Sequence, residues 1–115
     1  MSRTIVVTGA ASGIGLTTTG ILRERGERVI GVDLRDVEVT GDLSTPEGRT
    51  AAAKEATRLA GGTVDAVIAC AGISAPIPLT VSVNYFGVTE FLELLAPELA
   101  KSANPRAATL FGAAR

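Results

Sequence analysis

Short apolar, β-branched runs alternate along the chain with longer segments in which apolar positions recur at helical spacing. The runs predict strands over residues 4–8, 28–33, 64–70 and 107–111, with a shorter strand over 37–42. The segments between them predict helices that end at 25, cover about 45–59, and begin again near 80. This alternation indicates an α/β fold with a mainly parallel sheet and right-handed crossovers.

Two helix ends carry local signals. Ser44 is followed three residues later by Glu47, which is the spacing of a capping box, and Pro46 stands in the first turn, where its missing N–H is tolerated. These residues predict a helix start at Ser44–Thr45. Pro97 predicts that the last helix either kinks or ends early.

A glycine-rich turn separates the first strand from the first helix. Gly9, Gly13 and Gly15 form G-x-x-x-G-x-G, and the missing side chains permit a tight turn and let backbone amides approach a pyrophosphate. Asp33 ends the second strand, 20 residues beyond Gly13, where a carboxylate can accept hydrogen bonds from ribose hydroxyls. Strand, turn, helix and acid together predict dinucleotide binding. The alternative is a flexible loop with a solvated turn acid.

The acid also bears on the choice of dinucleotide. A 2′-phosphate about 5 Å from Asp33 would be repelled by roughly 3 kcal/mol per unit charge at an effective dielectric constant of about 20. Asp33 therefore favours NAD as the cofactor. Arg35 could offset the repulsion, and NADP is kept as the alternative on that ground.

Composition narrows the class of protein. With 115 residues, of which 46% are hydrophobic and 20% charged, the chain has the make-up of one compact domain. A net charge of -1 without a run of like charges disfavours nucleic-acid and membrane partners. The absence of histidine excludes a Ser-His-Asp arrangement and a His-ligated metal. A single cysteine and the lack of a leader pattern predict a cytoplasmic protein.

The segment Thr8–Gly15 resembles the TGxxxGxG cofactor motif of the short-chain dehydrogenase/reductases. The resemblance implies a Rossmann-type doubly wound parallel sheet, ending here after about the fifth strand, and a single NAD(P)-binding domain over 1–115 that is incomplete relative to the family. The family reaction is hydride transfer between a secondary alcohol or ketone and nicotinamide. Segments 32–36, 41–45 and 81–87 look most like those of bacterial 3α-hydroxysteroid dehydrogenase/carbonyl reductases.

The resemblance also implies residue roles. Asp42 would contact the adenine amino group, and Cys70-Ala71-Gly72 matches the end of the family's NNAG motif, with Ala69 and Cys70 in place of both asparagines. Asn84, in Val83–Gly87, matches the catalytic asparagine that holds a proton-relay water. The cofactor-binding positions expected are Gly9, Ser12, Gly13, Ile14, Gly15, Asp33, Leu34, Asp42, Leu43, Cys70, Ala71 and Gly72.

Other family positions find no match in this chain. Phe111–Ala114 stands where the catalytic serine is expected, and the one tyrosine, Tyr85, is followed four residues later by Thr89 instead of the lysine of Tyr-x-x-x-Lys. Cys70 is expected to be a packed thiol, with a reactive nucleophile as the alternative, because no basic residue adjoins it in sequence.

Three interpretations of the whole chain stay open. The first is the cofactor-binding portion of an NAD-dependent oxidoreductase whose intact form acts on a small alcohol, ketone or steroid. The second is a non-enzymatic nucleotide-binding module or degenerate remnant. The third is complementation by another chain, since an open sheet edge promotes self-association and a homo-oligomer.

Overall fold

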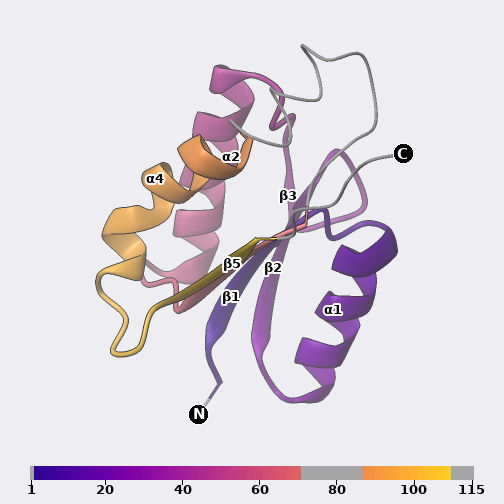
Figure 1. Cartoon of the computed structure of the whole chain (residues 1–115), viewed down its shortest axis with the longest axis vertical. Helices are drawn as coiled ribbons and strands as arrows, with labels where there is room; N and C mark the ends of the chain where they lie inside the picture. The colour runs from indigo at the N-terminus through magenta and orange to yellow at the C-terminus, as the bar shows by residue number, and fades with distance from the viewer. Residues whose placement is uncertain (1, 71–86, 110–115) are drawn as a thin grey trace.

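The computed structural model describes residues 2–70 and 87–109, which form a single sheet with helices on both faces (Figure 1). In chain order the described elements are β1 (Thr4–Thr8), α1 (Gly13–Glu24), β2 (Arg28–Asp33), β3 (Val39–Thr40), α2 (Pro46–Ala60), β4 (Ala66–Ala69), α4 (Gly87–Leu99) and β5 (Arg106–Thr109).

The sheet is parallel, and among the described residues it holds five strands in the order β3-β2-β1-β4-β5. The central strand β1 pairs with β2 through Val6 and Ile30, and with β4 through Val6 and Val67. The chain builds outward from β1 to β3 and then crosses back to add β4 and β5. This reversal places a topological switch point at the carboxyl end of β1, where open α/β sheets bind ligands. The predicted doubly wound fold is confirmed.

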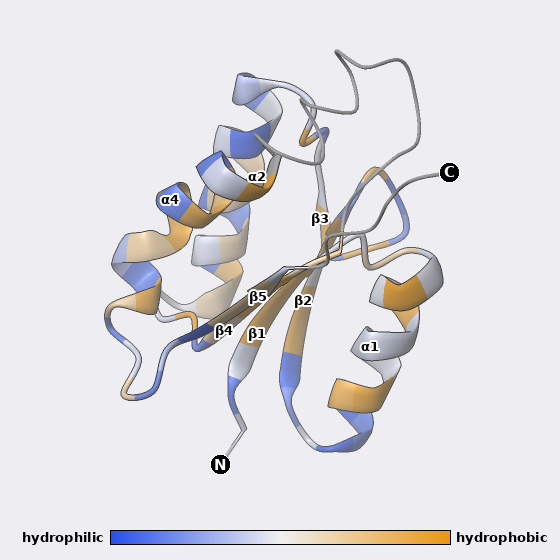
Figure 2. Cartoon of the chain, viewed as in Figure 1, coloured by the Kyte–Doolittle hydropathy of each residue, from blue (hydrophilic) through white to orange (hydrophobic). Residues whose placement is uncertain are grey.

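Alternate residues of each strand face opposite layers. Val6, Ile30 and Val67 lie in the larger core, under α2 and α4, together with Phe91 and Leu95, which are almost completely buried. On the other face, Ile5, Val7 and Val29 form a smaller core under α1. Figure 2 shows hydrophobic strands enclosed between the helices, and α1 also carries exposed hydrophobic residues, Ile14, Leu16 and Ile21. Apolar burial on both faces is what defines the strands as central.

Strand bounds agree with the sequence for β1 and β2 and differ for the others. β3 is only two residues long, Val39–Thr40, because only those residues pair with β2. β4 begins at Ala66, two residues later than predicted, although the Cys70 N–H still donates to the Thr8 carbonyl at 3.2 Å.

The start of α2 corrects the capping prediction. The N-cap is Thr45, whose hydroxyl oxygen accepts a hydrogen bond from the Gly48 N–H at 3.0 Å, and Pro46 is the first helical residue. Ser44 does not cap the helix because its hydroxyl donates to Asp42 Oδ1 at 2.6 Å. Because the Ser44 hydroxyl is already hydrogen-bonded to a neighbouring carboxylate, the hydroxyl of Thr45 caps the helix instead.

Of the two outcomes predicted for Pro97, a kink or an early end of the last helix, the early end does not occur. α4 continues through Pro97 to Leu99, and the Ala100 N–H still donates to the Ala96 carbonyl at 2.9 Å. The proline lies in the last turn, on an exposed position, so that its missing N–H and its ring are accommodated there. The predicted parts of this helix over 80–86, and of the last strand over 110–111, lie outside the described residues.

Candidate functional site

The carboxyl edge of the sheet collects the polar residues that the sequence singled out. Gly9 follows β1, Asp33 ends β2, Asp42 follows β3 and Cys70 follows β4. Because the strands are parallel, these positions share one edge of the sheet. The edge includes the switch point beside β1.

The glycine turn is built by backbone contacts that side chains would prevent. Gly9 has a φ of +71° and Gly13 a φ of +57°, both in the left-handed region that favours glycine. A Cβ added to Gly15 would lie 2.0 Å from the Gly9 carbonyl oxygen. Gly15 therefore lets the first turn of α1 lie directly on the loop that precedes it.

The first turn of α1 offers an N-terminus that suits an anion. Its N-cap, Ser12, makes no side-chain capping hydrogen bond, and no acidic residue lies in the first turn. Unpaired amides and the positive end of the helix dipole attract phosphate. Ile14, in the same turn, is 59% exposed and offers an apolar surface beside these amides.

Asp33 is held by the backbone on both of its carboxylate oxygens. Oδ2 accepts a hydrogen bond from the Ala11 N–H at 2.9 Å, within the glycine turn, and Oδ1 accepts from the Leu34 N–H at 2.7 Å. Each oxygen keeps a second lone pair that can accept from a hydroxyl. The partly buried acid is thus fixed beside the glycine turn with acceptor capacity left over.

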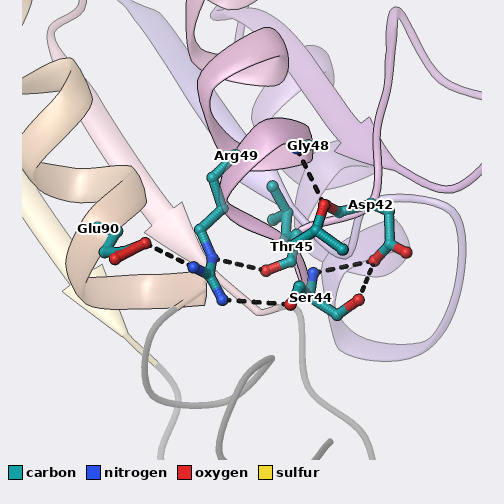
Figure 3. Close-up of polar contacts among 7 residues, drawn as sticks. Asp42, Ser44, Thr45, Gly48, Arg49 and Glu90 are labelled. Atoms are coloured by element: carbon teal, nitrogen blue, oxygen red, sulfur yellow. Dashed lines mark hydrogen bonds and ion pairs between the residues drawn. The ribbon is translucent and has the colours of Figure 1, made fainter.

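Asp42 forms a compact polar turn with Ser44 (Figure 3). Its Oδ1 accepts from both the Ser44 hydroxyl, at 2.6 Å, and the Ser44 N–H, at 2.9 Å. The Ser44 hydroxyl, then its N–H, hold the pKa of the Asp42 carboxyl below its usual range. Leu43, between them, is buried in the larger core. Asp42 is therefore an exposed, ionised acceptor on a turn that is anchored by its neighbour.

Comparisons with known proteins agree with this geometry. The chain is 38% identical to a 3-alpha-hydroxysteroid dehydrogenase/carbonyl reductase of Comamonas testosteroni over 109 residues, which cover 92% of this chain and 42% of the relative. It is 37% identical to a coniferyl-alcohol dehydrogenase of a Pseudomonas strain, over 80% of this chain and 38% of the relative. The chain thus spans less than half the length of the curated relatives it matches. No protein-family model matches it.

A solved structure extends the agreement to the fold. The 3-alpha-hydroxysteroid dehydrogenase of Pseudomonas sp. B-0831, solved in complex with NADH, superposes with a TM-score of 0.89 and 39% identity, over 93% of this chain and 46% of that one. The aldohexose dehydrogenase of Thermoplasma acidophilum, at 20% identity, shares the fold with a TM-score of 0.86.

The resemblance to the short-chain dehydrogenase/reductase family is confirmed. The sequence motif and both aligned relatives assign it to the N-terminal part of such proteins. Its similarity to bacterial 3α-hydroxysteroid dehydrogenase/carbonyl reductases, predicted from short segments, is confirmed.

Cys70, which the resemblance matches to the second asparagine of the family's NNAG motif, follows β4 directly. Burial raises the pKa of its thiol, so the group is neutral at physiological pH, and its side chain is half-buried. These features favour the packed thiol over the reactive nucleophile. Ala71, Gly72 and Asn84, the remaining predicted positions, lie outside the described residues.

One residue of the site was missed by sequence reasoning. Arg49, on α2, is 3% exposed, and its guanidinium donates from Nε to the Leu43 carbonyl at 2.9 Å and from Nη1 to Glu90 Oε1 at 2.5 Å. A signal did exist. Arg49 precedes Ala52, Ala53 and Ala56 by three, four and seven residues, which places it on the buried face of the helix.

Proposed function

We propose that the carboxyl edge of this sheet binds NAD(H). The pyrophosphate would lie on the glycine turn and the N-terminus of α1, the adenosine ribose on Asp33, and the adenine amino group on Asp42. One observation carries the proposal. Asp33 is hydrogen-bonded to the glycine turn at Ala11, so that the ribose acceptor and the phosphate cradle have a fixed relative position.

The preference for NAD over NADP rests on charge. Asp33 would repel a 2′-phosphate at the ribose. The neighbouring Arg35 side chain is 87% exposed, and its nearest acid is Asp36, at 4.0 Å. A solvated arginine shared with a second acid offsets little of that repulsion. The relative solved with NADH, at 39% identity, supports the same choice.

We propose further that the chain is the cofactor-binding portion of an oxidoreductase that acts on a secondary alcohol or ketone, within a single NAD(P)-binding domain over 1–115. When bound, nicotinamide would supply or accept the hydride. The names of the aligned relatives, which include a hydroxysteroid dehydrogenase/carbonyl reductase, favour a steroid or a simple carbonyl compound as substrate. Asn84 is proposed as the relay residue on its sequence match alone.

Calorimetric titration of the 115-residue chain with NADH and NADPH tests the binding proposal. We expect saturable binding of NADH, weaker binding of NADPH, and loss of about tenfold or more in NADH affinity in Asp33→Ala. Asp36→Ala is the matched control, because it removes the same charge from an 85% exposed side chain three residues away. Absence of NADH binding by a folded chain, or equal losses in both variants, would refute the proposal.

We also propose that the chain forms a homo-oligomer and is located in the cytoplasm. β5 lies at one edge of the described sheet, and its residues Arg106–Ala108 are exposed, which supports the predicted homo-oligomer. Sedimentation at tens of micromolar, with a stable monomer as the contrary result, tests this. Across the described ranges, no helix has the length and apolar character needed to cross a bilayer. The cytoplasmic location stays a proposal, to be tested by cell fractionation.

A further inference from the structure

Among the described residues, the buried charged side chain is that of Arg49, which contacts the Asp42–Ser44 turn. Only 4% of the Arg49 side chain is exposed, whereas 43% of the side chain of its partner Glu90 is exposed. Burying a guanidinium is costly unless its N–H groups are paired. What those groups bind is therefore informative about the role of the residue.

Two of the acceptors are carbonyl oxygens of the turn itself. Nε donates to the Leu43 carbonyl at 2.9 Å, and Nη2 donates to the Ser44 carbonyl at 3.4 Å (Figure 3). A further contact, from Nη1, reaches Glu90 on α4. One side chain of α2 therefore joins the β3–α2 turn to the first part of α4.

The same turn fixes the orientation of Asp42. Ser44, whose carbonyl contacts Arg49, donates its N–H and hydroxyl to Asp42 Oδ1. A hydrogen-bonded series thus runs from Glu90 through Arg49 and Ser44 to the Asp42 carboxylate. Within the described part of the chain, Oδ2 of Asp42 makes no hydrogen bond and is left for a ligand.

The backbone of Asp42 also lies against the start of α2. A Cβ added to Gly48 would lie 1.8 Å from the Asp42 carbonyl oxygen, so the turn lies directly against the start of α2. Because the start of α2 and the Arg49 guanidinium both contact the turn, the turn has little freedom to move. Asp42 itself is exposed and would otherwise sample several rotamers.

We infer that Arg49, held by Glu90, is a positioning residue that orients the Asp42–Ser44 turn to accept a hydrogen bond from the adenine amino group. The inference rests on the proposed function, since it assigns the adenine end of the same NAD(H) site. It makes nucleobase recognition dependent on a buried arginine that does not touch the cofactor.

The test compares NADH with reduced nicotinamide hypoxanthine dinucleotide, which lacks the adenine amino group. The unaltered chain should bind NADH about tenfold more tightly, because Asp42 accepts from that amino group. Arg49→Met keeps the apolar stem and removes the donors. It should weaken NADH binding about tenfold and bring the ratio of the two affinities near one, with Arg49→Lys between.

Controls separate positioning from general loss of structure. Arg58→Met removes an arginine from the exposed side of the same helix, where it pairs with Glu55, and should leave the ratio unchanged. Glu90→Gln retains Arg49 and should shift the ratio in the same direction by a smaller factor, so the test does not depend on the folding of Arg49→Met. Circular dichroism establishes that each variant is folded.

Three outcomes would overturn the inference. Equal loss of both affinities in Arg49→Met would indicate a structural role only, and an unchanged ratio in Arg49→Met and Glu90→Gln would show that the turn orients itself. Failure of the unaltered chain to bind either dinucleotide would instead refute the proposed function, and this inference with it.

Discussion

Asp33 Oδ2 accepts a hydrogen bond from the Ala11 N–H at 2.9 Å, which joins the acid at the end of β2 to the turn after β1. The acid therefore has two separable roles, as a backbone acceptor and as a negative charge. A substitution that keeps the oxygen and removes the charge distinguishes them.

Asp33→Asn should change the preference between the two dinucleotides more than it changes folding. Its amide oxygen can still accept from Ala11, while the exposed Leu34 N–H loses its acceptor, so we expect the free energy of unfolding to fall by about 1 kcal/mol. Removal of the charge should reduce the preference for NADH over NADPH about tenfold, allowing for solvent screening. Calorimetry with both dinucleotides checks this, and an unchanged preference would show that the charge is not what selects NAD.

Two glycines of α1 should respond oppositely to alanine. In Gly15→Ala the new Cβ would meet the Gly9 carbonyl at 2.0 Å, and we expect the free energy of unfolding to fall by about 1–3 kcal/mol, with loss of NADH binding. Gly20 has open space around it, and Gly20→Ala should stabilise the chain by about 0.5–1 kcal/mol. Urea unfolding of both variants measures the difference. A neutral Gly15→Ala would contradict the close packing of turn and helix.

Removing the N-cap of α2 should destabilise the chain through one hydroxyl. Thr45→Ala leaves the Gly48 N–H without its acceptor and should reduce the free energy of unfolding by about 1 kcal/mol. Thr45→Ser keeps the hydroxyl and is the matched control. If Ser44→Ala reproduced the loss of helix stability while Thr45→Ala did not, the capping assignment would be wrong.

Acid should weaken the contact between the starts of β1 and β4. Asp65 accepts from the Ser102 hydroxyl at 2.6 Å and the Thr4 N–H at 2.8 Å, and these bonds, in that order, hold the pKa of its carboxyl below the usual range. A pKa that is lower in the folded state than in the unfolded chain stabilises the fold at pH values above the unfolded-state pKa, which is about 3.9. This stabilisation is lost as the pH falls through the folded-state pKa.

Urea unfolding between about pH 6 and about pH 3 measures this dependence. Ser102→Ala should raise the pKa of Asp65 toward its unfolded value and flatten the acid limb of the stability curve. Asp65→Asn should remove the contribution of this group altogether. If Asp65→Asn lost as much unfolding free energy at low pH as the unaltered chain, other carboxylates would be responsible for the loss.

Much of the fold could be predicted because its determinants are local. Continuous apolar runs define β1 and β2, since a strand buried on both faces leaves no polar positions. The pattern misleads where one local signal competes with another. Ser44 has the spacing of a cap but is engaged by Asp42, and Pro97 looks like a helix terminator although it falls where one missing N–H is tolerated.

Some residues of the site could be predicted from the sequence and others could not. Gly15 and Asp33 belong to a motif whose spacing is readable along the chain, because one βα unit and the next strand contain it. Arg49 and Glu90 are 41 residues apart, and their pairing arises only when α2 and α4 pack on the same face of the sheet. No local spacing reports a contact of that kind.

The contact between Gly15 and Gly9 bears on how a glycine motif is used as a marker in genomes. Glycine at position 15 stabilises the fold whether or not a dinucleotide is present, because a Cβ there would meet the Gly9 carbonyl oxygen. A descendant that lost its ligand would therefore keep Gly15, while an exposed acid such as Asp42 would be free to drift. Among relatives, the acids at the strand ends are therefore the better indicators of retained dinucleotide binding. The glycine indicates only common descent.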